Sequence, residues 1–123
     1  MRPHENLEVW SRAIEFVVTV YKETSEFPKE EKFGLTSQIR RAAVSVPANI
    51  AEGAARQSSK EFSHFLFIAQ GSASELETEL LIAQRLGYLE QNAYEGMYKE
   101  INTIARMIVG LSQHLKRKVT MEN

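Results

Sequence analysis

Four stretches of this chain repeat apolar residues at steps of three and four, and this spacing restricts the possible folds more than any other feature. Such steps place side chains on one face of an α-helix. Turn and capping residues separate the stretches, and no strand-like alternation competes with the helical pattern. The sequence therefore predicts an all-α fold of four amphipathic helices.

The first two helices are expected over about residues 6–25 and 35–55. Proline disfavours helix in the residue before it, so Phe27-Pro28 ends the first helix and residues 28–33 form a short connector. Pro47 lies inside the second helix and clashes with the carbonyl of Ala43, so we expect a kink at 43–47. The expected core stripes are Leu7, Trp10, Ile14, Val17 and Tyr21 in the first helix and Leu35, Ile39, Ala42, Val46 and Ile50 in the second.

The third helix is expected to begin at a capping box, in which the Ser58 hydroxyl accepts from the Glu61 amide, and to stop at Gly87. Asn92 and Glu95 are the cap pair expected for the fourth helix. The expected core stripes are Phe62, Leu66, Ala69, Ala73, Leu76, Leu80 and Ala83 in the third helix and Met97, Ile101, Ile104, Ile108, Leu111 and Leu115 in the fourth.

Short connections between long helices make chain neighbours antiparallel. We therefore expect residues 1–123 to form one up-down-up-down, left-handed four-helix bundle, with globin-like crossings as the alternative. A chain of 123 residues is one domain's worth and buries roughly two-thirds of its unfolded surface.

Composition excludes several classes of protein. The net charge of -1 differs from that of a uniformly basic nucleic-acid binder, so any such role depends on local charge. The chain has no cysteine, which removes disulfide scaffolds and thiol catalysis and is compatible with a reducing cytosol. The first residues lack the apolar run of a signal peptide, and no segment is apolar enough to span a bilayer. We expect a cytoplasmic protein without membrane contact.

Two helices carry more apolar surface than one bundle needs. The first helix has a second stripe that includes Val9, Phe16 and Val20, and the third has a stripe that mixes Phe67 and Leu81 with the small residues Gly71 and Ser74. Exposed apolar stripes mark interfaces, so we expect these seven residues to form the contacts of a homo-oligomer. The alternative is that both helices simply have wide core stripes.

Candidate catalytic and metal-binding patterns are sparse. Glu61 and His64 form one Glu-x-x-His, whereas a di-iron bundle needs two such motifs and further glutamates. Glu75 and Glu79 share a helix face, but no nucleophile accompanies them, which favours a solvated acidic face or one that faces a basic neighbour. We expect no enzymatic activity, metal, cofactor or small-molecule substrate.

Basic residues are expected to converge at one end of the bundle. There the start of the first helix, the end of the second, the start of the third and the end of the fourth meet. The cations gathered are Arg2, Arg56, Lys60, Lys116, Arg117 and Lys118, and the acidic residues at the same end are Glu5, Glu8, Glu52 and Glu61. Convergent cations suit phosphate recognition, while a solvated end of mixed charge is the alternative.

The stretch from Arg40 to Arg56, RRAAVSVPANIAEGAAR, strongly resembles the signature of the four-helix bundle family encoded in intervening sequences of bacterial 23S rRNA genes. The run from Glu61 to Glu79 matches its second block, and the resemblance extends from Leu7 to about Leu115. It implies a non-enzymatic bundle that assembles as a homopentamer. Related accessory proteins of diversity-generating retroelements are thought to bind nucleic acid through strongly basic surfaces, whereas this chain is mildly acidic.

The proline motif itself has a structural interpretation. Pro47 leaves the backbone carbonyl near Ala43 unpaired. Asn49, Glu52 and Gly53 follow it, and small polar side chains there can bind this carbonyl or a neighbour's backbone. Arg40, Arg41 and Arg56 flank the motif and are the better functional candidates, either in ion pairs between subunits or in phosphate contacts.

We therefore expect an oligomeric helical adaptor that contacts ribosomal RNA or another nucleic acid. The contacting residues are Arg40, Arg41, Arg56, Lys60, Lys116, Arg117 and Lys118. The alternative is a protein-binding scaffold without nucleic acid, because residues 34–60 sum to a charge of +3 and residues 61–95 to -5, which makes them complementary surfaces.

Overall fold

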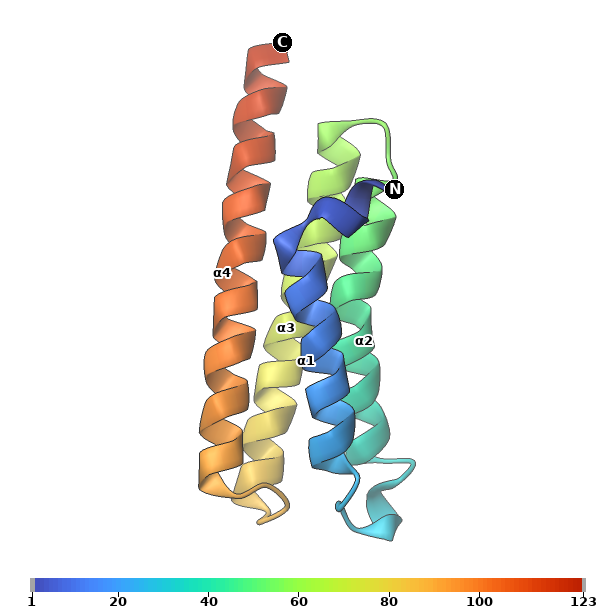
Figure 1. Ribbon diagram of the computed structural model, residues 1–123, viewed down its shortest axis with the longest axis vertical. Helices are drawn as coiled ribbons and strands as arrows, with labels where there is room; N and C mark the ends of the chain where they lie inside the picture. Colours follow the sequence, from blue (N-terminus) through green and yellow to red (C-terminus); the bar gives the residue numbers. More distant parts are fainter. Residues whose placement is uncertain (1, 123) are drawn as a thin grey trace.

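Four helices lie side by side and alternate in direction along the chain (Figure 1). The computed structural model describes residues 2–122, so Met1 and Asn123, the ends of the expected domain, lie outside the described residues. The elements are η1 (Pro3–Asn6), α1 (Glu8–Thr24), η2 (Lys29–Glu31), α2 (Leu35–Ala54), α3 (Ser59–Arg85) and α4 (Gln91–Glu122). The all-α four-helix prediction is confirmed, while the left-handed turn of the bundle stays a prediction.

Local sequence signals define both ends of α3. The Ser58 hydroxyl accepts a hydrogen bond from the Glu61 amide at 3.1 Å, as the capping box predicts. The Glu61 carboxylate meets the Ser58 hydroxyl at 3.2 Å. Gly87 has a φ of 82°, the left-handed conformation expected after the helix. The cap predicted at Asn92 is wrong, because α4 already begins at Gln91.

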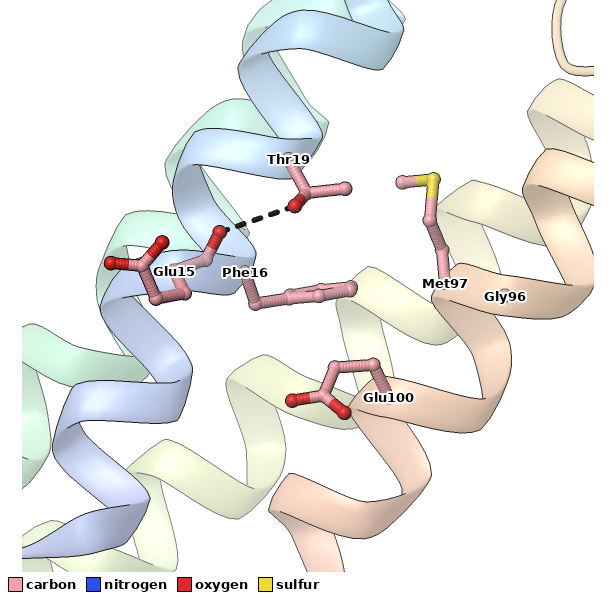
Figure 2. Close-up of a pocket in the computed structure, with 6 residues that line it drawn as sticks. All are labelled: Glu15, Phe16, Thr19, Gly96, Met97 and Glu100. Atoms are coloured by element: carbon pink, nitrogen blue, oxygen red, sulfur yellow. Dashed lines mark hydrogen bonds between the residues drawn. The ribbon is translucent and has the colours of Figure 1, made fainter.

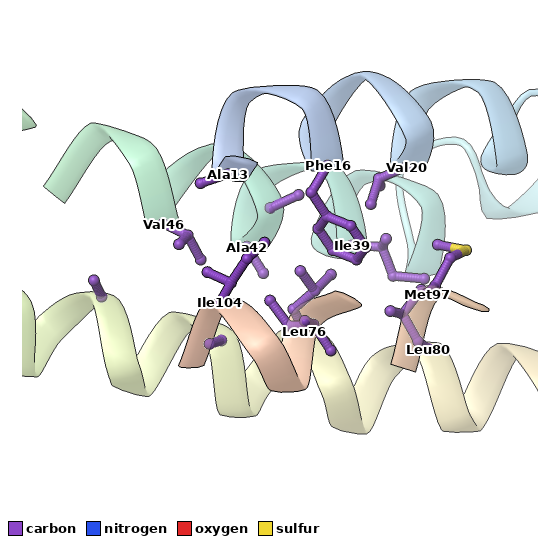
Figure 3. Packing of buried hydrophobic residues seen from close by; sticks show 14 of the residues in the cluster. Ala13, Phe16, Val20, Ile39, Ala42, Val46, Leu76, Leu80, Met97 and Ile104 are labelled. Atoms are coloured by element: carbon purple, nitrogen blue, oxygen red, sulfur yellow. The ribbon is translucent and has the colours of Figure 1, made fainter. Parts of the chain in front are cut away.

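Apolar side chains from all four helices meet along the axis of the bundle (Figure 3). The stripes predicted for α2, α3 and α4 supply most of this core, and only Leu35, Phe62 and Leu111 lie at its margin. α1 packs against α2 and α4, and α3 packs against the same two helices. Within the described residues, no helix combines the length and the apolar character needed to cross a lipid bilayer.

The core of α1 is centred on the second stripe, while Leu7, Trp10 and Val17 of the predicted stripe are partly buried at its margin. Val9, Phe16 and Val20, expected at an oligomer interface, are 4%, 4% and 0% exposed inside the bundle, so that assignment is wrong. Ile14 and Tyr21, expected in the core, are 36% and 43% exposed. Both stripes have helical spacing, so periodicity alone cannot choose between them. The buried stripe includes the small Ala13, whereas the predicted stripe includes the large, exposed Tyr21.

The last turn of α2 approaches α3 closely at Gly53. A Cβ atom placed on Gly53 would lie 2.8 Å from the Phe65 Cβ and 2.9 Å from the Phe62 Cδ1. Earlier in α2, the Ser45 and Ser72 hydroxyls share a hydrogen bond of 2.8 Å between the two helices. α2 continues through the buried Pro47 between these two contacts, and the expected kink stays a prediction.

Replacing Gly53 by alanine should lower the free energy of unfolding by about 1–3 kcal/mol, because the added methyl group overpacks the α2–α3 contact. Gly110→Ala is the matched control, since nothing lies within 4 Å of a Cβ there and alanine is the better helix former. Urea denaturation followed by circular dichroism measures both. Equal stability of the Gly53 variant and the wild type would contradict the close approach.

Candidate nucleic-acid interface

Arg40 is occupied by contacts within the bundle. Its Nε donates to the Thr24 Oγ1 at 2.9 Å, and a terminal nitrogen donates to the Tyr21 carbonyl at 3.2 Å. The guanidinium also lies over the Tyr21 ring, 4.4 Å from its centroid. Arg40 therefore fastens the C-terminal turn of α1 to α2, and its predicted phosphate contact stays a prediction.

Arg41 is exposed beside an open groove of about 410 Å³ between α2 and α3, which Ser45, Ser72 and Glu75 also line. At 1.5 Å per residue it lies about 22 Å along the helical path from Arg56. Arg40 and Arg41 are therefore near the opposite end of the bundle from the other predicted cations. The seven predicted basic residues do not form one surface.

Asn49 of the proline motif acts on its own helix. Its side-chain nitrogen donates to the Ser45 carbonyl at 2.8 Å and lies 3.0 Å from the Ser45 hydroxyl. It thus orients the serine that bonds to Ser72 on α3. The motif joins helices, in agreement with its structural interpretation, although the carbonyl bound is that of Ser45 and not that of Ala43.

At the end of α2, Arg56 and Glu52 form an ion pair one helical turn apart. The Arg56 guanidinium also lies 4.8 Å from the centroid of the Phe65 ring on α3. Even with both contacts, 41% of the Arg56 side chain remains exposed. Lys60 lies nearby, on the first turn of α3.

The C-terminal turns of α4 extend past the α2–α3 loop (Figure 1). Lys116, Arg117 and Lys118 are exposed near the C-terminal end of α4. This end of α4 lies at the same end of the bundle as the α2–α3 loop and the N-terminal segment (Figure 1). Five of the seven predicted cations are thus gathered at one end of the bundle, together with Glu5, Glu8, Glu52 and Glu61.

The outer stripe predicted for α3 is exposed. Phe67 and Leu81 are 72% and 37% exposed, and Gly71 and Ser74 lie open between them. The four α3 residues of the predicted interface are therefore available at the surface, unlike the three from α1.

A small cleft of about 270 Å³ lies between α1 and α4 (Figure 2), and no sequence pattern indicated it. Phe16 and Met97 line it from facing helices, with Glu100 beside them. Glu100 already binds Arg12 through two hydrogen bonds of 2.7 and 3.1 Å. The bidentate pair fastens α1 to α4 and occupies the acidic group of this cleft.

Glu79 is the buried carboxyl group of the described chain. It is 6% exposed, so the expectation of a solvated face is wrong for this residue. Its Oε1 has no hydrogen-bond partner. Burial, with the nearby Glu75 carboxylate, raises the pKa of Glu79 from 4.5 to about 7.

His64 and His114 are exposed, and the Glu61 carboxylate contacts Ser58. Among residues 2–122, no three side chains of the types that bind metals are grouped to hold an ion.

These contacts define a four-helix bundle in which polar side chains such as Arg12, Arg40 and Ser45 join neighbouring helices and five of the seven candidate cations lie at one end. The chain belongs to the family described as 23S rRNA-intervening sequence protein, whose model matches residues 5–110. It is also similar to a protein of unknown function from the S23 ribosomal protein family of Bacteroides thetaiotaomicron. That crystal structure is 28% identical, with a TM-score of 0.76, over 85% of this chain and 97% of the other. No curated protein matches the chain.

Glu79 should make stability depend on pH. Its folded-state pKa lies above the ordinary value, so the folded protein holds a proton that the unfolded chain releases. Stability therefore falls as pH rises from about 4.5 to about 7, by up to about 3 kcal/mol. Glu79→Gln should remove this loss. Denaturant unfolding at pH 5 and pH 8 measures it, with Glu77→Gln expected to follow the wild type. The same pH profile for wild type and Glu79→Gln would show that Glu79 is not the cause.

Proposed function

We propose that this protein is a non-enzymatic, self-assembling helical adaptor that acts in the cytoplasm and binds RNA through the basic end of its bundle. The observation that carries the proposal is the run of exposed cations Lys116, Arg117 and Lys118 on α4, whose C-terminal end reaches past the α2–α3 loop (Figure 1). Lys60 and Arg56 add charge at the same end. Convergent cations bind phosphates and release counterions whatever the sequence of the RNA.

The names of the family and of the Bacteroides protein both refer to the ribosome. Ribosomal RNA is therefore the first RNA to test as a ligand. Arg40 and Arg41 are not part of the proposed surface, because both lie too far along α2 from Arg56 and Arg40 is also bonded to α1.

Self-assembly is supported by the exposed stripe of Phe67, Gly71, Ser74 and Leu81 on α3. Small residues in the middle of the stripe let another backbone come close, while the apolar ends gain from burial. On α1, the outward Ile14, Val18 and Tyr21 offer a second, different apolar surface. Two unlike surfaces on one chain favour a head-to-tail ring, and the family resemblance makes five copies the expected number.

Phe67→Glu should dissociate the assembly, because it places a charge in the proposed contact. Size-exclusion chromatography with light scattering should give a multiple of 14.0 kDa for the wild type and a smaller mass for this variant. Phe33→Glu is the matched control, since Phe33 is 88% exposed at the opposite end of the bundle. A wild-type particle of 14.0 kDa at micromolar concentration would contradict the assembly.

Replacing Lys116, Arg117 and Lys118 together by alanine should weaken RNA binding at least roughly tenfold at 0.1 M salt. It should also reduce the slope of log affinity against log salt by about 2, because each lost phosphate contact on a single strand contributes about 0.7. Fluorescence anisotropy with a labelled 23S rRNA fragment measures both quantities.

The charge-matched control replaces Lys22, Lys29 and Lys32, which are exposed at the opposite end. If both triple variants bind like the wild type, the basic end is not the RNA surface.

A protein-binding scaffold without RNA is the second candidate. Arg41 on α2 and Glu75 on α3 are both exposed beside one groove, as charged contacts between subunits would require. Weak RNA binding with no salt dependence, combined with loss of assembly in Glu75→Lys, would favour this scaffold over the adaptor.

A further inference from the structure

A cleft of about 330 Å³ lies at the corner where α2 ends and α3 begins. It is lined by Arg56, Lys60, Glu61, His64 and Phe65, a combination of aromatic rings and cations. The volume is at the lower limit of small-ligand pockets, which run from about 300 to 1,000 Å³. None of the groups that join α1 to α4 contributes to it.

The rings of this corner cleft are held in a fixed arrangement. Phe65 is half-buried, and its Cβ lies against Gly53, so the close α2–α3 contact positions the ring. The Arg56 guanidinium lies over Phe65 at 4.8 Å, and the His64 ring meets Phe65 edge-on with centroids 5.6 Å apart. The ion pair with Glu52 restricts Arg56 further.

The Arg56 guanidinium over the Phe65 ring forms a flat surface on which a planar, electron-rich ring can stack. The Arg56 side chain is 41% exposed with its guanidinium over the Phe65 ring, and the exposed His64 lines the same cleft. Proteins stack unpaired nucleobases on aromatic side chains and on arginine planes of this kind. Lys60 lies in the same cleft as a cation for the adjoining phosphate.

We propose that the corner cleft binds one unpaired nucleotide of single-stranded RNA, with the base stacked on Arg56 and against His64 and the phosphate near Lys60. This inference rests on the proposed RNA-binding function and narrows its ligand. In a duplex the bases are already stacked on one another, so no base face is free to stack on the protein. The basic end then supplies affinity for any RNA, and the corner cleft selects unpaired strands.

Arg56→Lys tests stacking separately from charge. Lysine keeps the positive charge and the partner Glu52 but lacks the planar guanidinium. It should weaken binding of a labelled ten-nucleotide oligoadenylate about fivefold or more, the loss expected for one stacked base. Affinity for an abasic strand of equal length and for an RNA duplex should stay unchanged, as should the slope against salt, since no charge is lost.

Two further variants complete the experiment. His64→Ala should also weaken binding of the oligoadenylate and leave the affinity for the abasic strand unchanged. Arg56 and His64 are both exposed, so both variants should fold. Arg41→Lys is the matched control, an exposed arginine on α2 outside the cleft, and should bind every probe like the wild type.

The outcomes separate this inference from the proposed function. If Arg56→Lys and His64→Ala bind all three probes like the wild type, or lose affinity equally for all of them, the corner cleft does not stack a base, while RNA binding stands. If the wild type binds none of the probes, the RNA-binding function fails together with this inference.

Discussion

The close contact between α2 and α3 holds the aromatic residues at the start of α3 against the last turn of α2. A glycine at position 53 lets the last turn of α2 approach Phe62 and Phe65, and the shared hydrogen bond of Ser45 and Ser72 keeps the same two helices together further along. Larger side chains at these points would force the helices apart, because packed interiors have little free volume. The corner cleft and the shape of the loop that follows α2 depend on this contact of Gly53 with Phe62 and Phe65.

Much of the fold could be predicted, because its signals are local. Ser58 and Glu61 mark the beginning of α3 through a side-chain bond to the backbone, and Gly87 marks its end because glycine accepts a positive φ at little cost. The choice between the two apolar stripes of α1 could not be made in this way. Val20 and Tyr21 both belong to arrays with helical spacing, and only the neighbouring helices determine which of them is buried.

The candidate site was less predictable for the same reason. Arg40 and Arg41 are adjacent in the sequence, yet a helical step of about 100° directs one toward α1 and the other toward the groove with α3. Arg12 and Glu100 are 88 residues apart, so no local pattern pairs them. Burial of Glu79 likewise follows from the packing of other helices. Spacing assigned the charged residues to helices, and tertiary contacts determined which of them remained exposed.

Because the helices differ in length, the helical structure of the last turns of α4 depends on whether an anion is bound there. α4 has 32 residues and α1 has 17, so the terminal turns of α4 lie beyond the reach of α1. Helical segments without packing partners are only marginally stable, and three successive cations repel one another. An anion bound there would relieve that repulsion. The population of helical conformers in these turns would then rise with ligand concentration, as mass action requires of any state that binds preferentially.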